Sequence, residues 1–240
     1  MNNNLVTKSN AVIQASYKLN LNEQRILLSC ISQNDSRESL KENQELSLSA
    51  QDYSKLFGLE LKHAYQEIRD ASDNLFERHL WLTAKNGDPI KTRWISSVRY
   101  RDGGITLTFA KDLIPYLTEL SSTFTSYRLE NITKLTSIYA IRLYEMLIQW
   151  RKIGKVEFSL DDFRETLGIE KKEYPRMFDF KKHVLNIAIH QINENTDIKC
   201  RYSEVKSGRK ITGFVFHFGK DALTQIELED VIADAKKALN

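Results

Sequence analysis

The sequence predicts an α+β protein in which one small module, three helices followed by a β-hairpin, occurs twice in tandem. Two observations support this fold class. A short capped helix that stops at a glycine recurs at a spacing of 110 residues, and the segments around both copies follow the same order of helices and strands. One such helix arises by chance, but two with matching flanks at a fixed spacing indicate a duplicated domain.

The repeated segment covers residues 49–59 and 159–169. Both copies open with Ser-x-x-Asp, and a serine oxygen at this position accepts hydrogen bonds from the free amides of a helix's first turn. An aromatic residue and an apolar residue follow. Gly58 and Gly168 then close the segment, and glycine suits the left-handed end of a helix. Each copy is therefore expected to be a short helix that ends in a tight turn.

Longer helices are expected on both sides of each short helix. Amphipathic patterns upstream cover 21–28 and 138–148, and downstream a third helix is expected at 62–78 in the first copy. Its counterpart begins after Pro175, a residue tolerated near a helix start, and runs to about residue 194.

Two strand-like segments joined by a turn follow each third helix. In the first copy Trp94, Val98 and Tyr100 are expected on one strand face and Arg93 and Arg99 on the other. In the second copy the strands are marked by Ile198, Cys200 and Tyr202 and by Phe214, Phe216 and Phe218, with Gly208 in the turn. Three helices and a hairpin in this order define a winged helix, so the sequence predicts two tandem, pseudo-duplicated winged-helix domains.

Charge is distributed unevenly over the predicted domains. The first domain, residues 1–120, has 15 basic and 15 acidic residues, whereas the second, residues 121–220, has 18 and 12. The remaining stretch, 221–240, is an acidic C-terminal tail with 2 basic and 5 acidic residues. The basic excess therefore points to the second domain as the main DNA-binding domain, and the first is expected to make auxiliary DNA contact.

In a helix-turn-helix, the helix after the tight turn enters the major groove. In the second copy this helix has an apolar stripe that repeats every four residues from Phe180 to Ile192, opposite a polar and basic stripe. A solvated amphipathic helix is the alternative, but the preceding capped helix and the following basic hairpin favour DNA. The predicted DNA contacts of this domain are Arg176, Lys181, Lys182, His183 and Asn186 on the helix and Lys206, Arg209 and Lys210 in the wing.

The corresponding helix of the first copy is the weaker candidate. Its C-terminal half carries Asp73 and Glu77, and the domain as a whole is neutral. The predicted contacts here are Lys62, His63, Gln66 and Arg69 on the helix and Arg93, Arg99 and Arg101 in the hairpin.

The motifs of several other protein classes are missing from the sequence. No Gly-x-x-x-x-Gly-Lys-Ser/Thr segment occurs, and the five histidines include no His-x-His pair, so neither a catalytic site, a cofactor nor a metal is expected. Cys30 and Cys200 are expected to be buried and reduced. No apolar segment is long enough to cross a membrane and the first residues do not resemble a secretory signal, so a cytoplasmic location is expected.

The sequence resembles the iteron-binding plasmid replication initiators over about residues 5–220. The N-terminal marker is Lys8–Leu19 followed by 21–25, and the junction between copies matches at 113–117, 124–127 and 139–145. The second copy matches at 180–185 and 192–198. The resemblance implies no enzymatic activity, and it places the strongest base contacts on the second recognition helix, at Arg176, Lys181, Lys182 and His183.

The resemblance also implies partners. A monomer of this family binds direct repeats in double-stranded DNA, promotes opening of the origin, and recruits the host initiator and the replicative helicase, with chaperones as further partners. A homodimer, formed largely through the first domain, binds an inverted repeat and represses the protein's own gene. No membrane partner is implied.

Three alternatives remain open from the residues alone. The first is a winged-helix transcriptional regulator without origin function, and the second is a DNA-nicking enzyme that uses a tyrosine. The third is an adaptor whose hairpins and acidic tail bind proteins. Binding to tandem repeats would distinguish an initiator from the regulator. Nicking of supercoiled DNA would indicate the enzyme, and failure to bind any duplex at low salt would indicate the adaptor.

Overall fold

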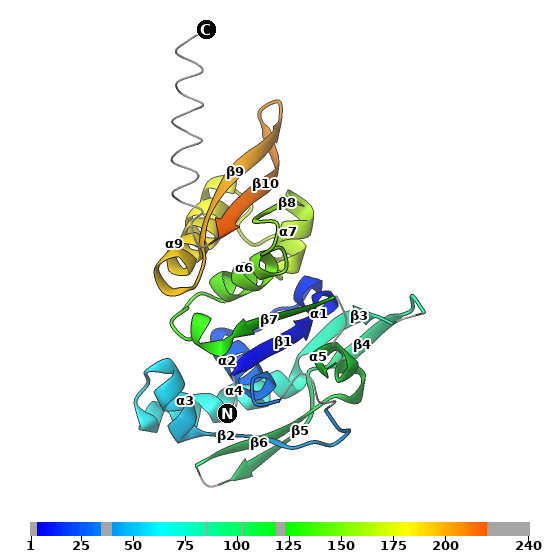
Figure 1. Ribbon diagram of the computed structural model, residues 1–240, viewed down its shortest axis with the longest axis vertical. Helices are drawn as coiled ribbons and strands as arrows, with labels where there is room; N and C mark the ends of the chain where they lie inside the picture. The colour runs from blue at the N-terminus through cyan, green and yellow to red at the C-terminus, as the bar shows by residue number, and fades with distance from the viewer. Residues whose placement is uncertain (1–3, 35–39, 85, 102, 119–122, 220–240) are drawn as a thin grey trace.

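The computed structural model describes residues 4–34, 40–84, 86–101, 103–118 and 123–219, which form two modules stacked along the long axis of the molecule (Figure 1). The predicted boundary at residues 120/121 and the acidic tail, 221–240, lie outside the described residues. A single hydrophobic core runs through both modules, from Val6 in the first strand to Phe218 in the last.

The first module contains most of the strands. Its helices are α1 (Asn10–Gln14), α2 (Leu21–Ile31), α3 (Ala50–Phe57), α4 (Leu61–Glu77) and α5 (Pro115–Thr118). Its strands are β1 (Leu5–Ser9), β2 (Leu46–Ser49), β3 (His79–Thr83), β4 (Pro89–Arg93), β5 (Ile95–Arg101) and β6 (Gly104–Phe109). The wing is the antiparallel sheet β2-β6-β5, while β3 and β4 form a separate hairpin.

The second module repeats this plan with fewer strands. It contains α6 (Ile138–Ile148), β8 (Lys155–Ser159), α7 (Leu160–Thr166), α8 (Met177–Phe180), α9 (Asn186–Asn195), β9 (Lys199–Ser207) and β10 (Lys210–Gly219). Its antiparallel sheet has the order β8-β10-β9, equivalent to β2-β6-β5. The strand before each short helix pairs with the returning strand of the wing in both modules, which confirms the predicted duplication.

The short helices form as their sequence pattern predicts. The Ser49 hydroxyl accepts a hydrogen bond from the Asp52 amide at 3.0 Å, and Ser159 accepts one from Asp162 at 3.1 Å. Both helices are followed by a glycine in the left-handed region, with φ +66° at Gly58 and +69° at Gly168. These local interactions fix the tight turn that precedes each third helix.

The prediction that Arg93 and Trp94 lie on opposite faces of a wing strand was wrong. Arg93 is the last residue of β4, whereas β5 begins at Ile95, so Arg93 is not part of the wing. Trp94 is fully buried between the two strands. The sequence pattern over 93–100 does not distinguish one strand from two, because the irregular register between Ile95 and Ser97 changes which face the side chains occupy.

Strand β7 (Phe124–Arg128) connects segments that are distant in the sequence. It pairs antiparallel with β1, with Leu5 opposite Arg128 and Ser9 opposite Phe124. The two strands lie beside α6 at the junction of the modules (Figure 1). This pairing joins residues from either side of the predicted domain boundary.

A buried polar network lies under this junction. Lys8 Nζ is 2.5 Å from Glu145 Oε1, both side chains are 1% exposed, and the Tyr127 hydroxyl donates to the same oxygen at 2.5 Å. Burial, followed by the charge of Glu145, raises the pKa of Tyr127 well above its usual value. Because Glu145 lies on α6, the network ties that helix to β1 and β7.

Arg142, one turn before Glu145, extends the network to the second short helix. Its guanidinium donates to the carbonyl oxygens of Ile13 at 2.9 Å, Ala15 at 3.0 Å and Thr166 at 2.7 Å, and to the Tyr17 hydroxyl. One side chain thus holds the α1–α2 segment against α7. This arrangement fixes the second module's helix-turn-helix relative to the first module.

We expect Gly168→Ala to destabilise the protein more than Gly58→Ala. Both positions cost about 1–2 kcal/mol for a left-handed alanine. A Cβ at Gly168 would also lie 2.3 Å from the Tyr17 carbonyl oxygen, whereas one at Gly58 would meet no atom within 4 Å. Overpacking adds about 1–3 kcal/mol at Gly168. Urea unfolding of the two variants measures the difference, and equal losses would contradict the close approach of the α1–α2 segment.

Candidate nucleic-acid interface

The recognition helix of the second module runs from Met177 to Asn195 and consists of α8, a π-helical turn at Lys181–Leu185, and α9. The predicted apolar stripe is confirmed, because Phe180, Val184, Ala188 and Ile192 are all buried. The opposite side is exposed, and it carries Lys182, His183, Asn186 and His190. The sequence therefore predicted which face of this helix is free for a partner.

The π-helical turn is a feature that the sequence did not predict. It accommodates an extra residue, and such turns occur frequently at functional sites. Within this turn Val184 and Leu185 are both fully buried, while Lys182 and His183 are both exposed. The π turn thus places two consecutive polar side chains on the free face of the helix.

Two of the predicted DNA contacts are already ion-paired with one acid of the wing. Glu204 lies 2.7 Å from Lys181 Nζ and 2.8 Å from Lys206 Nζ. These hydrogen bonds, with Lys181 first, lower the pKa of Glu204, and the bond to Glu204 raises the pKa of Lys181. Glu204 therefore couples the wing to the recognition helix and offsets two positive charges.

Three other predicted DNA contacts of the second module form no ion pair among the described residues. Within the described part of the chain no carboxylate pairs with Lys182, Arg209 or Lys210, and all three side chains are exposed. Arg176 is exposed too, although its Nε lies 2.6 Å from Asp179. Among the predicted DNA contacts of this module, the cations without an ion pair therefore lie at Lys182 and at the wing tip.

The wing of the second module is a long hairpin that extends away from the helices (Figure 1). Ser207 pairs with Lys210 across a two-residue turn in which Gly208 has φ +61°. Such a turn needs a residue that tolerates positive φ, which glycine does without steric cost. The turn presents Arg209 at the tip, between Lys206 and Lys210.

The first module exposes its predicted helix contacts, Lys62, His63, Gln66 and Arg69, on α4. Gln66 donates to Asp70 at 2.7 Å, and the Arg69 guanidinium lies 5.0 Å from the centre of the Tyr100 ring. Only Lys62 and His63 have no such side-chain contact among these four described residues.

The arginines predicted for the first hairpin are paired within the protein. Arg99 and Arg101 both form ion pairs with Glu45, near the start of β2. Arg93 donates to the Phe76 carbonyl oxygen at 2.5 Å and lies 3.3 Å from Glu77, so it holds the end of α4 against β4. The three predicted arginines of the first hairpin region are therefore engaged within the protein.

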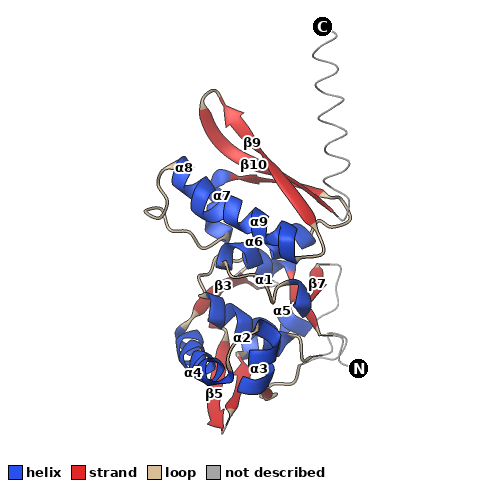
Figure 2. Ribbon diagram, turned by 90° about the vertical axis from the view of Figure 1, so that its left-hand side faces the viewer, coloured by secondary structure: helices blue, strands red, loops and turns tan. Residues whose placement is uncertain are grey.

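Figure 2 shows α4 and the α8–α9 helix one above the other on the same side of the molecule. Each is the third helix of its module, and each presents its exposed face away from the core. α4 and the start of the α8–α9 helix therefore lie on the same side of the molecule in this view, below the hairpin β9–β10.

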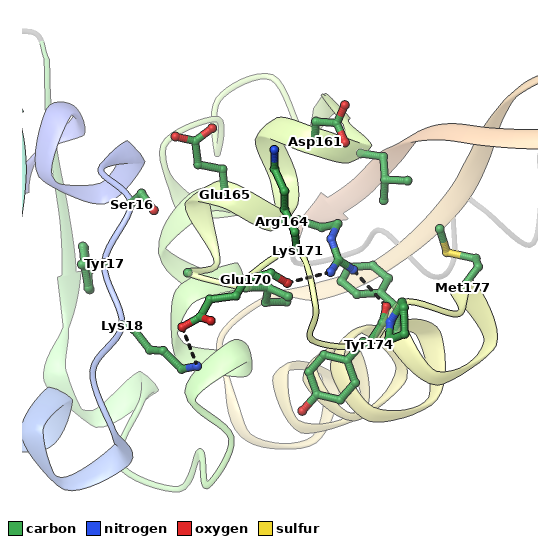
Figure 3. Close-up of a pocket in the computed structure, with 15 residues that line it drawn as sticks. Ser16, Tyr17, Lys18, Asp161, Arg164, Glu165, Glu170, Lys171, Tyr174 and Met177 are labelled. Carbon is green, nitrogen blue, oxygen red and sulfur yellow. Dashed lines mark hydrogen bonds and ion pairs between the residues drawn. The ribbon is translucent and has the colours of Figure 1, made fainter.

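A cleft of about 1010 Å³ lies between the α1–α2 segment and the turn before the second recognition helix (Figure 3). Lys18 reaches across it to Glu173 at 2.7 Å and Glu170 at 3.8 Å. The hydrogen bond to Glu173 raises the pKa of Lys18 and lowers that of Glu173. The two modules are therefore joined here by exposed ion pairs as well as by the buried network.

Arg164 is a positioning residue that sequence reasoning missed. Its guanidinium donates to the carbonyl oxygens of Glu170 at 3.2 Å, Glu173 at 2.5 Å and Tyr174 at 3.3 Å (Figure 3). Tyr174 has φ +46°, an uncommon conformation for a residue other than glycine. Arg164 thus fixes the turn that aims the recognition helix, and the only sequence signal was an arginine in a short capped helix.

Possible metal ligands, membrane-spanning helices, tyrosines and cysteines were also of interest from the sequence. No group of three or more His, Cys, Asp or Glu among the described residues is arranged to hold a metal, and no described helix is long and apolar enough to span a membrane. Burial raises the pKa of Tyr139 and of Tyr144. Cys30 and Cys200 are buried free thiols, as predicted, and burial raises the pKa of each to about 12.

Two winged helices in tandem, each with a recognition helix on the same face, define a class of DNA-binding proteins. The chain matches the model of the initiator replication protein WH1 domain over residues 5–148 and that of the WH2 domain over residues 159–218. The protein therefore belongs to the family of initiator replication proteins.

Individual relatives agree with this assignment. The chain is 26% identical to the PI protein of Escherichia coli over 240 residues, covering 85% of this chain and 79% of the relative. It is 25% identical to an uncharacterised 27.6 kDa protein of the same species, covering 85% and 91%. A crystal structure of the Pi initiator protein in complex with iteron DNA superposes with a TM-score of 0.77 at 22% identity, covering 91% and 98%, which supports the fold.

Proposed function

We propose that this protein initiates plasmid replication by binding directly repeated sites in double-stranded DNA as a monomer, with both modules on one face of the duplex. The observation that carries this proposal is the placement of α4 and the start of α8–α9 one above the other on one side of the molecule (Figure 2). Two recognition helices in successive major grooves correspond to a site of roughly 20 base pairs.

The contacts divide between the modules by their available charge. Lys182, near the start of the second recognition helix, and Asn186, in the middle of the same exposed face, contact bases, since lysine matches guanine edges and asparagine matches adenine. Arg176 and His183 flank them. Arg209 and Lys210 at the wing tip contact phosphates, and Lys62 and His63 provide the corresponding, weaker contacts of the first module.

Membership in the initiator family supports the later steps. Binding to the repeats promotes opening of the adjacent duplex and recruits the host initiator and replicative helicase, with host chaperones acting on the protein itself. A homodimer formed through the first module binds an inverted repeat and represses the protein's own gene. The PI relative and the Pi–iteron complex are the comparisons that support the repeat-binding step.

Footprinting on the DNA that flanks the protein's own gene tests this function. We expect protection of tandem repeats at regular spacing, and replication of a linked origin that depends on them. Protection of an inverted repeat alone, without origin activity, would instead favour a transcriptional regulator. No protected duplex at low salt would overturn DNA binding altogether.

We expect Arg209→Ala to reduce the salt dependence of DNA binding. Each phosphate contact that is lost lowers the slope of log affinity against log salt by about 1. Binding isotherms at several salt concentrations measure this slope. Lys111→Ala is the matched control, because Lys111 is an exposed cation paired with Glu42 at 2.9 Å and lies next to α5. Equal slopes for Arg209→Ala and the unmodified protein would show that the wing tip does not contact DNA phosphates.

A further inference from the structure

The two recognition helices expose apolar side chains at their N-terminal ends. Phe178, the second residue of α8, is 69% exposed, more than any other large hydrophobic residue that the structure describes. Leu61, the first residue of α4, is 56% exposed. An exposed apolar residue therefore occurs within the first two residues of the third helix in both modules.

Exposed apolar residues are concentrated on these helices. Of the eight large hydrophobic side chains that are exposed in the described residues, four lie on α4 or α8–α9: Leu61, Tyr65, Phe178 and Ile187. The two helices make up less than a fifth of the described chain. Single exposed apolar residues are normal, but clustering on one functional element marks a surface that a partner covers.

Phe178 belongs to the DNA-facing side of its helix and not to the core. The core contacts of this helix are made by Phe180 and Val184, which are fully buried. Phe178 precedes Lys182 by four residues, and Asn186 follows four residues later, so the three side chains share the exposed side. An apolar group thus stands beside the cation and the amide that the proposed function assigns to base contacts.

The chemistry of the major groove identifies what this apolar group contacts. The edges of the bases there present donors and acceptors, and the 5-methyl group of thymine is the apolar exception. The N-terminal residues of a recognition helix are those that approach base edges. A partner protein would also cover exposed apolar side chains, but it would not explain why Lys182 and the basic wing lie beside them.

We propose that Phe178, and Leu61 in the first module, contact thymine methyl groups and so specify thymine at one position in each half of the DNA site. This inference rests on the proposed function and deepens it. It adds an apolar component to a recognition surface otherwise made of cations and amides.

The test replaces each thymine of a synthetic duplex, carrying one protected repeat from the DNA beside the protein's own gene, by deoxyuridine, which lacks only the methyl group. One methyl contact corresponds to about a fourfold change in affinity. We expect a loss of this size at one thymine facing the second module. Phe178→Ala should weaken binding to the thymine duplex and remove the difference between thymine and deoxyuridine at that position.

Leu61→Ala should remove the discrimination at a different thymine, in the half bound by the first module. Ile153→Ala is the control, because Ile153 is 66% exposed but lies in the loop between α6 and β8. It should leave the whole deoxyuridine profile unchanged. Circular dichroism of each variant confirms that it is folded.

Three results would overturn the inference. The unmodified protein could tolerate deoxyuridine at every position, or Phe178→Ala could retain the full discrimination. The third result is that Phe178→Ala changes only the sedimentation coefficient of the free protein, which would show that Phe178 contacts a second copy of this protein. The first two leave repeat binding intact, whereas failure of the proposed function appears as the loss of any protected site.

Discussion

Lys182→Ala is expected to reduce the affinity for the specific DNA site by about 1–3 kcal/mol while leaving binding to random DNA nearly unchanged. Lys182 lies on the exposed side of the recognition helix, and no carboxylate among the described residues pairs with it. Its charge is therefore available to a base, and its place within the π turn sets its direction. Binding isotherms on the protected repeat and on a scrambled duplex measure both quantities.

Lys181→Ala is the informative neighbour of this variant. Lys181 is half-buried and bonded to Glu204, so binding to DNA would have to break an existing ion pair. We expect its loss of specific affinity to be smaller than that of Lys182→Ala. An equal loss by Lys182→Ala on specific and random DNA would show that Lys182 contacts a phosphate instead of a base.

Glu145→Gln is expected to destabilise the protein by about 3–5 kcal/mol, because removing one partner of a buried ion pair leaves the other charge uncompensated. Lys8 is 1% exposed and lies 2.5 Å from Glu145, so its ammonium would remain in the core without a counter-ion. Tyr127 would also lose the carboxylate that accepts its hydrogen bond. Chemical unfolding followed by far-ultraviolet circular dichroism measures the change.

An exposed pair at the same junction provides the control. Lys18 and Glu173 are 2.7 Å apart, but their side chains are 46% and 33% exposed. Pairs in such solvated positions contribute about 0–1 kcal/mol, so Glu173→Gln should have a small effect. If the two glutamine variants were equally stable, the buried network would not be what holds α6 against β1 and β7.

The resemblance of 139–145 to the initiator family included Arg142 and Glu145, yet it carried no information about what they touch. In the sequence they are charged residues within an apolar helix, a pattern that also fits a partly solvated surface. Their partners lie on β1, β7, the α1–α2 segment and α7, up to 137 residues away. Only the fold, which brings these segments together, makes the two charges part of the core.

The electrostatics of the candidate site show the same division. The sequence predicted Lys181 and Lys182 as contacts of the helix and Lys206 and Arg209 as contacts of the wing, without indicating which of them is ion-paired. The structure separates them, since Glu204 holds Lys181 and Lys206 while Lys182 and Arg209 are free of carboxylate partners among the described residues. Pairing across a hairpin and a helix depends on their relative placement, which residue types alone do not specify.

What the sequence determined by itself is the part of the protein governed by local interactions. The serine caps, the left-handed glycines after α3 and α7, and the buried stripe of the second recognition helix follow from hydrogen bonds and periodicity within a few residues of one another. The tertiary structure decided the β1–β7 pairing, the place of Arg93 in β4, the π turn and the buried charges at the module junction. These depend on contacts between distant segments, where the energy of a side chain is set by the neighbours that the whole fold supplies.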